Sequence, residues 1–251
     1  MIPTFLERFK TEIEQYKLET IRIIARLIQG SKTLPLTQSK FLGKPFLPLT
    51  QDYPKNKNGD PMILWAQINF EELPQLENYP TKGIFQLFVS STEWEDMDDY
   101  KILFHKDLNQ EFQTDFSFLT KELYEESPIN YEHELTFAKD IEYGGAEDFR
   151  FQLSFDGKDY YDFQETLSNE QKAEMDKLFY TIGHKIGGYA YFTQSDPREY
   201  DKGKRNDLLV LQIDTDDEIM FGDSGVMNVF LNAEDLKAQN FDKAYFNWDC
   251  S

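Results

Sequence analysis

Two segments of the chain repeat each other 145 residues apart, and this repeat constrains the fold more than any other sequence feature. Lys40-Phe41-Leu42-Gly43 aligns with Lys185-Ile186-Gly187-Gly188, and Trp65-Ala66-Gln67-Ile68-Asn69 aligns with Val210-Leu211-Gln212-Ile213-Asp214. After a small length change, the segment 83–89 aligns with 225–231. Three matching blocks in one order predict an internal duplication with pseudo-twofold symmetry, the repeats covering about residues 39–90 and 184–232.

Each copy has the pattern of a small β unit. A glycine-bearing turn leads into an aromatic strand, an apolar strand surrounds the glutamine, and a glycine-led strand of alternating residues follows. We therefore expect two small antiparallel sheets, one in each copy. Further aromatic segments at 100–104, 131–137 and 149–155 are bounded by turn-forming residues and predict additional strands.

Helices are expected at the start and in the middle of the chain. Thr4 and Glu7 have the spacing of a capping box, and apolar residues then recur at helical period, which predicts a helix to about Glu19. The isoleucine-rich segment 21–27 alternates at period two and predicts a strand. A second helix is expected from Ser168 to Gly183. The predicted fold is α+β, predominantly β, in a single domain over residues 1–251.

The charge balance narrows the classes of partner. The 251 residues include 46 acidic and 26 basic side chains, which give a formal net charge of −20. Such a charge repels nucleic-acid phosphates and anionic lipid surfaces, so we expect neither a nucleic-acid nor a membrane partner. Hydrophobic residues make up 40% of the chain, which is enough to form a folded core.

The cysteine content and the N-terminal sequence indicate the compartment. The single cysteine, Cys250, cannot form an internal disulfide, which is typical of a reducing compartment. The first residues, Met1 to Arg8, reach acidic side chains at once and lack a basic segment followed by an apolar one. No apolar run approaches the roughly 20 residues that a membrane span needs. We therefore expect a cytoplasmic protein.

Motifs in both halves resemble those of a known family. Ser39-Lys40-Phe41-Leu42-Gly43-Lys44-Pro45-Phe46-Leu47-Pro48, the Gln67 block, the segments 184–189 and 192–198, and Phe221-Gly222-Asp223-Ser224-Gly225 together resemble the bacterial YwqG-like family, a domain of unknown function. The resemblance implies a β-rich duplicated fold and no established catalytic residues. The chain departs from the family pattern at Leu42, where a second glycine is usual, and at Ala190, where proline is usual.

Gln67 and Gln212 are the first candidate site residues, because each amide lies among apolar neighbours in a predicted strand. A buried amide without partners costs on the order of 1–3 kcal/mol, so something must satisfy each one. One interpretation is that the amides tie down adjacent loop backbone. The other is that they contact a ligand at the junction between the copies.

Acidic side chains form the second group of candidates. The cluster Asp214, Asp216, Asp217, Glu218 and Asp223 could gather a hard cation such as Ca²⁺. However, Ile219 stands where an EF-hand loop needs glycine, and the distal glutamate is missing, so a solvated turn is favoured and no metal site or cofactor is predicted.

Two nucleophile or base hypotheses are weaker. Gly222-Asp223-Ser224-Gly225 is similar to the nucleophile segment of trypsin-like proteases, but it aligns with the Gly83 turn and is better explained by hairpin geometry. His184 could act as a base with Asp196 or Asp223, but a histidine beside Gly183 more often pairs with the last carbonyls of a helix.

An acidic run around Trp94 completes the candidates. One large aromatic side chain among Asp96, Asp98, Asp99 and their acidic neighbours suits a surface that attracts and anchors a basic protein. The first hypothesis is therefore a non-catalytic protein-interaction module, of the kind that an immunity-type antagonist of a basic effector would use. The alternative is a small-molecule or metal-dependent enzyme with its site at the junction of the repeats.

Overall fold

The computed structural model describes residues 1–30 and 32–251. Within these residues, ten antiparallel strands form one sheet, in the order β10-β9-β8-β7-β1-β6-β2-β3-β4-β5. The strands of the first half are β1 (Leu18–Leu27), β2 (Lys40–Phe41), β3 (Ile63–Asn69), β4 (Ile84–Val89) and β5 (Tyr100–His105). Those of the second half are β6 (His133–Glu142), β7 (Lys185–Gly187), β8 (Asp207–Asp214), β9 (Val226–Asn232) and β10 (Tyr245–Asp249).

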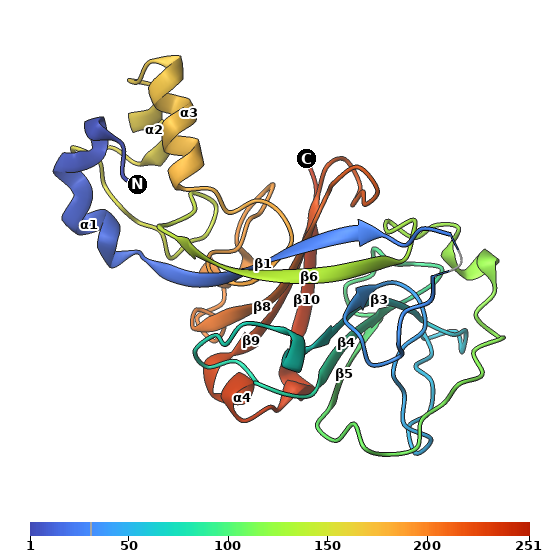
Figure 1. The fold of residues 1–251 in the computed structure, drawn as a ribbon. Helices are drawn as coiled ribbons and strands as arrows, with labels where there is room; N and C mark the ends of the chain where they lie inside the picture. Colours follow the sequence, from blue (N-terminus) through green and yellow to red (C-terminus); the bar gives the residue numbers. More distant parts are fainter. Residues whose placement is uncertain (31) are drawn as a thin grey trace.

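In the same described ranges, four short α-helices and several 3₁₀ turns precede or connect the strands. The helices are α1 (Lys10–Gln15), α2 (Tyr160–Gln164), α3 (Asn169–Leu178) and α4 (Ala233–Lys237). The 3₁₀ turns are Thr4–Phe9, Phe70–Glu72, Lys121–Tyr124, Pro197–Glu199 and Phe241–Lys243. Helices α1, α2 and α3 gather at one end of the long β1–β6 pair, and β3, β4 and β5 lie toward its other end (Figure 1).

The strand order is the same when read outward from the centre in either direction. Beyond β6 come β2, β3, β4 and β5, and beyond β1 come β7, β8, β9 and β10. The predominantly β fold with two repeated antiparallel units is therefore confirmed. The units do not form separate sheets as expected, because β1 and β6 pair with each other along ten residues and join them.

Each unit contributes its first strand to the other unit. Strand β1 precedes the first copy in the chain but pairs with β7 of the second, where Ile21 faces Ile186. Strand β6 precedes the second copy but pairs with β2 of the first, where His133 faces Phe41. The two units therefore exchange their first strands within one chain.

The sheet curls until its two edge strands approach each other. The Tyr100 hydroxyl of β5 donates a hydrogen bond to the Ala244 carbonyl at 3.2 Å, and the Tyr100 ring lies 5.7 Å from the Phe246 ring of β10. The main apolar core fills the interior, with Trp65 packed against both Phe221 and Phe246. Burial of this apolar surface is the main force that closes the sheet.

A second apolar core lies under the helices. It includes Phe9, Phe155, Phe163, Met175 and other side chains from the N-terminal segment, the 151–155 segment, α2 and α3. The Phe155 and Phe163 rings stack with centroids 4.9 Å apart.

Several local predictions need correction. The capping box at Ser168 and Gln171 is confirmed, but α3 ends at Leu178, five residues before Gly183. The first helix has no side-chain cap at Thr4 and ends at Gln15, because the chain must enter β1 at Leu18.

The segment 149–155 forms no strand, although Phe151, Leu153 and Phe155 are buried alternately as the pattern suggests. These side chains pack against the helices instead of a neighbouring strand. The other two predicted strands are confirmed with shifted ends, as β5 and β6.

Candidate functional site

The Gln67 side chain is fully buried on β3, and its amide bonds to the first copy and to the loop just before it. Its Oε1 accepts hydrogen bonds from the Phe46 backbone N–H and from Gln86 Nε2, both at 2.8 Å. Its Nε2 donates to the carbonyls of Leu36 and Gln38 at 2.7 and 2.8 Å. Both donor and both acceptor positions are therefore used to hold the loop before and after β2.

Gln212 on β8 repeats this arrangement. Its Oε1 accepts from the Tyr191 backbone N–H at 2.8 Å, and its Nε2 donates to the carbonyls of Thr181 and Gly183 at 3.0 and 2.7 Å. All three partners stand 145 residues after their counterparts in the first copy. Each glutamine thus ties down loop backbone next to its own copy, and among the described residues neither amide is hydrogen-bonded to the other copy.

A buried lysine accompanies each glutamine, and sequence reasoning did not single it out. Lys40 faces Gln67 across the β2–β3 ladder, and Lys185 faces Gln212 across β7–β8. Burial lowers the pKa of both ammonium groups to about 8. Lys40 Nζ donates to the Lys44 carbonyl at 3.1 Å, and Lys185 Nζ donates to the equivalent Tyr189 carbonyl. The alignment of Lys40 with Lys185 is the sequence feature that could have identified this buried pair.

A hydrogen bond between the Asp214 backbone and the His184 side chain repeats one between the Asn69 backbone and the Ser39 side chain in the first copy. His184 Nδ1 accepts from the Asp214 backbone N–H at 2.9 Å, where Ser39 Oγ accepts from the Asn69 N–H at 2.9 Å. Because Nδ1 is an acceptor, the ring proton lies on Nε2, which is 3.0 Å from Asp216 Oδ2. The histidine therefore links two turns of the second copy.

The predicted partners of His184 are different in the structure. It contacts neither Asp196 nor Asp223 within hydrogen-bond distance, and it is not at a helix end, since α3 ends at Leu178. The Asp214 carboxylate is buried and accepts from the backbone N–H groups of Gly183 and Thr215. Burial raises the pKa of Asp214.

Asp196 belongs to a buried ionic network that the sequence analysis missed. The Arg198 guanidinium is fully buried and lies 2.6 Å from Asp196 and 2.8 Å from Asp148. Burial alone would raise the pKa of Asp148, but Arg150 and Arg198 hold it well below its usual range. Such a paired network serves packing of the loops around β8 and leaves no free acid or base.

The acidic run around Trp94 is folded against the protein. Trp94 is half-buried, with its ring 4.8 Å from Trp248 and 6.1 Å from Phe221. Asp99 is buried and accepts from the Lys57 backbone N–H at 3.2 Å. Lys57 Nζ pairs with Glu93 at 2.5 Å and with Asp96 at 2.9 Å, which lowers the pKa of Asp96.

Asp98 and Asp223 are exposed, and aromatic contacts bring their segments together. Asp223 lies in the turn that follows Phe221, and Phe221 contacts Trp94 of the acidic run. Ser224 in this turn is exposed with a φ of 56°, so the turn has the tight geometry expected of a hairpin. We call the exposed carboxylates Glu93, Glu95, Asp98 and Asp223 the acidic surface.

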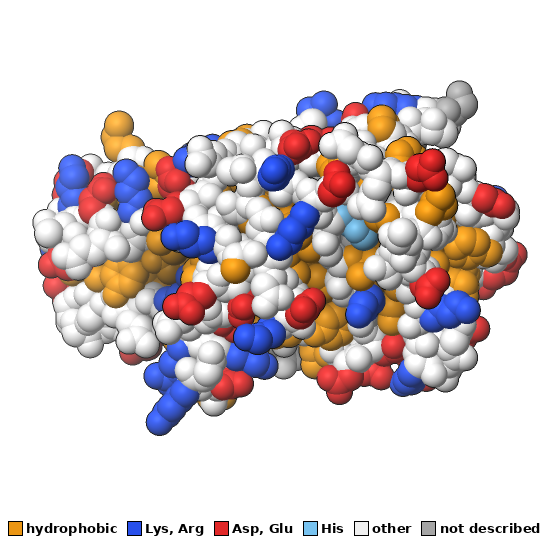
Figure 2. All heavy atoms as spheres, turned by 90° about the horizontal axis from the view of Figure 1, so that it is seen from below, with side chains coloured by type: hydrophobic (Ala, Val, Ile, Leu, Met, Phe, Trp, Pro, Cys, Tyr) orange, Lys and Arg blue, Asp and Glu red, His pale blue; other side chains and the backbone are white. Residues whose placement is uncertain are grey.

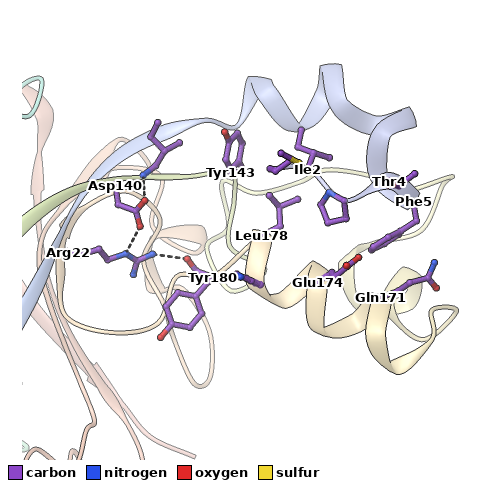
Figure 3. Close-up of a pocket in the computed structure, with 14 residues that line it drawn as sticks. Ile2, Thr4, Phe5, Arg22, Asp140, Tyr143, Gln171, Glu174, Leu178 and Tyr180 are labelled. Carbon is purple, nitrogen blue, oxygen red and sulfur yellow. Dashed lines mark hydrogen bonds and ion pairs between the residues drawn. The ribbon is translucent and has the colours of Figure 1, made fainter.

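A cavity of about 1200 Å³ lies elsewhere, between the N-terminal segment and α3 (Figure 3). Arg22 and Asp140 lie at the end of the cavity next to the sheet. The Arg22 guanidinium forms ion pairs with Asp140 and Glu142 and donates hydrogen bonds to the Tyr180 and Ile182 carbonyls. Apolar side chains make up most of the rest, including Ile2, Phe5, Tyr143 and Leu178. None of the candidate site residues lines this cavity.

Other features of the described residues limit the choice of function. Within residues 1–30 and 32–251, no three His, Cys, Asp or Glu side chains are grouped so that they could hold a metal ion. No helix in the same ranges has the length and apolarity that a membrane crossing requires. The face shown in Figure 2 carries acidic and basic side chains interspersed, so the excess negative charge does not form one patch on that side.

Comparison with known proteins places the chain in a family. A search of curated proteins found no match. The model of one family, described as "Domain of unknown function (DUF1963)", matches residues 39–250. This range includes both glutamine ties, both buried lysines and the acidic surface. Since the match covers well over half of the residues, the chain belongs to the family of the domain of unknown function DUF1963.

Proposed function

We propose that this chain is a non-catalytic protein-interaction module that binds a basic protein partner through the acidic surface. The observation that carries the proposal is the contact of Trp94 with Phe221 and Trp248, which joins two acidic segments far apart in the sequence. The exposed carboxylates there belong to a chain of net charge −20. Charge of one sign at such a surface speeds association with a partner of opposite charge.

The burial of the other candidates also supports binding over catalysis. Gln67, Gln212 and Asp214 are buried and bonded to loop backbone. No observation among the described residues favours the alternative of an enzyme with a site at the junction of the repeats. A basic toxin or nuclease, neutralised by an immunity-type antagonist, is the partner class that suits this charge. The proposal includes a YwqG-like protein of the bacterial cytoplasm, on the resemblance of its motifs; the free thiol of Cys250 is typical of a reducing compartment.

Co-purification from native lysate at low and high salt tests the proposal. A variant that neutralises the acidic surface (Glu93→Gln, Glu95→Gln, Asp98→Asn and Asp223→Asn) is compared with a control variant that removes as many exposed carboxylates on and near the helices (Glu12→Gln, Glu14→Gln, Glu165→Gln and Glu174→Gln). We expect the wild type and the control to retain a basic protein at low salt and the first variant to lose it. Equal retention by both variants, or no basic protein with the wild type, would contradict the proposal.

A further inference from the structure

The two copies differ at one buried position beside their glutamine ties. In the first copy, Gln86 Nε2 donates to the Phe46 carbonyl at 2.6 Å, and Gln86 Oε1 lies 2.9 Å from His105 Nε2. Burial lowers the pKa of His105 to about 4, so the ring is neutral near pH 7 and its Nε2–H donates to Gln86. The amide of Gln86 is thereby fully bonded.

In the second copy, shorter side chains take both places. Val226 faces Asp249 in the β9–β10 ladder as Ile84 faces His105 in β4–β5, so Asp249 stands where His105 does. Asn228 likewise stands where Gln86 does, and its Nδ2 donates to the Tyr191 carbonyl at 2.9 Å. The histidine donor of the first copy is thus replaced by a carboxylate, which only accepts.

Asn228 Oδ1 and Asp249 Oδ1 are among the buried oxygen atoms of the second copy that have no hydrogen-bond partner, and the Thr193 hydroxyl oxygen Oγ1 lies beside the Asp249 carboxylate. We call these three atoms the oxygen cluster. Asn228 is fully buried, and it points to the same side of the sheet as Asp249 because the residue facing it, Asn247, is two positions from Asp249 on the same strand. Thr193 is held next to Asp249, since its backbone N–H donates to Asp249 Oδ2 at 3.1 Å.

The charge of Asp249 is also uncompensated. Within residues 1–30 and 32–251, no lysine, arginine or histidine forms an ion pair with its carboxylate, which accepts from the N–H groups of Thr193 and Gln194 and lies beside the Thr193 hydroxyl. Burial raises the pKa of Asp249, and the nearby Asp214 carboxylate raises it further. Asp249 is half-buried, and a carboxylate that is partly removed from water without a cation carries a cost that a bound cation would remove.

We propose that the second copy binds a hard metal cation of the Ca²⁺ type through Asn228 Oδ1, Asp249 Oδ1 and Thr193 Oγ1. The donors are carboxylate, amide and hydroxyl oxygens, the ligands that Ca²⁺ and Mg²⁺ prefer, and they include neither nitrogen nor sulfur. The first copy lacks the site, because the His105 N–H occupies the corresponding amide oxygen. This inference is independent of the proposed basic partner, which would bind at the exposed acidic surface.

Calorimetric titration and thermal melting of chelator-treated protein with Ca²⁺, Mg²⁺ and Zn²⁺ test this site. We expect Ca²⁺ to bind and to raise the Tm of the wild type by several degrees, because a ligand that binds only the native state stabilises it. Asp249→Asn should bind Ca²⁺ at least about tenfold more weakly. Glu14→Gln, which removes an exposed carboxylate on α1 away from the oxygen cluster, should respond as the wild type does.

A double variant makes the test independent of folding defects. Asn228→Gln with Asp249→His gives the second copy the side chains of the first, and we expect it to be more stable than the wild type in chelator and to show no Ca²⁺ response. Absence of any Ca²⁺ or Mg²⁺ response in the wild type would overturn the proposal and assign the oxygen cluster to a bound water. An unchanged response in Asp249→Asn, or a response to Zn²⁺ alone, would overturn it equally.

Discussion

At the scale of single residues, the amide of Gln67 holds loop backbone in place through its hydrogen bonds. Its four hydrogen bonds reach two segments of loop backbone and the neighbouring Gln86 side chain, all away from solvent. A buried polar group that loses its partner costs about 1–3 kcal/mol, so one side chain that satisfies several groups has a large effect on stability. Gln212 has the same role in the second copy.

Removal of this amide should destabilise the protein strongly. We expect Gln67→Ala to lower the free energy of unfolding by about 3–5 kcal/mol, because several buried backbone groups lose their partner at once. Urea unfolding followed by circular dichroism measures the change. The exposed Gln75 provides the control, and Gln75→Ala should change stability by less than about 0.5 kcal/mol. A loss below about 1 kcal/mol for Gln67→Ala would contradict the structural role.

His105 should make stability depend on pH in the mildly acidic range. Its pKa is about 4 in the folded protein against an ordinary value of 6.5, so between these values the unfolded chain binds a proton that the folded one does not. Stability is therefore lost as the pH falls from 6.5 toward 4, by about 2–3 kcal/mol from this residue.

The variant His105→Gln isolates this contribution, since an amide can still donate to Gln86 but does not titrate. We expect the difference in unfolding free energy between wild type and variant to shift in favour of the variant as the pH is lowered. Parallel pH profiles for the two proteins would show that His105 is not the titrating group.

The residues that the sequence singled out and those that it missed differ in a physical way. Gln67 and Gln212 could be found because an amide in an apolar strand stands out in the sequence. Arg198, Asp148 and Asp196 could not be paired in advance, because their contacts join loops whose path depends on the whole fold. The burial of Trp94 against Trp248 was missed for the same reason, as 153 residues separate Trp248 from the segment that it bonds at Glu95.

At the scale of elements, the turn after β7 depends on close approach of its backbone to a buried carboxylate. Gly188 has a φ of 74°, and a Cβ there would overlap the Glu142 carboxylate. That carboxylate is bonded by Lys185 and by the Tyr189 backbone N–H, both at 2.7 Å, so it cannot move aside. In the first copy, Leu42 takes the position of Gly187 and keeps a positive φ of 56°, against 74° for Gly187, so a leucine there adopts the backbone conformation of the glycine.

Alanine substitutions should separate overlap from backbone strain. We expect Gly188→Ala to cost about 3 kcal/mol or more, since it adds overlap with Glu142 to the strain of a positive φ. Gly183→Ala has a similar φ of 96° but no neighbouring atom within 4 Å, so strain alone should cost about 1–2 kcal/mol. Thermal melting of both variants checks the order, and equal losses would refute the role given to Glu142.

Helices and strands were predicted correctly where they depend on local contacts, and less well where they depend on partners far away in the sequence. The capping box at Ser168 is a local interaction, and it formed as predicted. The alternating pattern at 149–155 marked real burial, but a strand also needs a partner strand, and the helical core supplied the contacts instead. The exchange of β1 and β6 between the units has no local signal, so the sequence predicted two sheets where there is one.

At the scale of the whole molecule, the β1–β6 pair carries the connection between the units. Strands β1 and β6 pair with each other along one edge. Along its other edge, β1 pairs with β7 of the second copy and β6 pairs with β2 of the first. We propose that residues 1–251 therefore fold as one domain, in which neither repeat is stable without the first strand of the other. Separate stability of the halves would require each unit to keep its own first strand, which the observed pairing does not allow.

Amide hydrogen exchange of the intact chain tests this account most directly. It predicts that the backbone amides of β1, β6, β3 and β8 are protected to the same degree and lose protection together as denaturant is added, because they open only on global unfolding. Loss of protection in one repeat at lower denaturant than in the other, or rapid exchange throughout β1 while β7 stays protected, would contradict it.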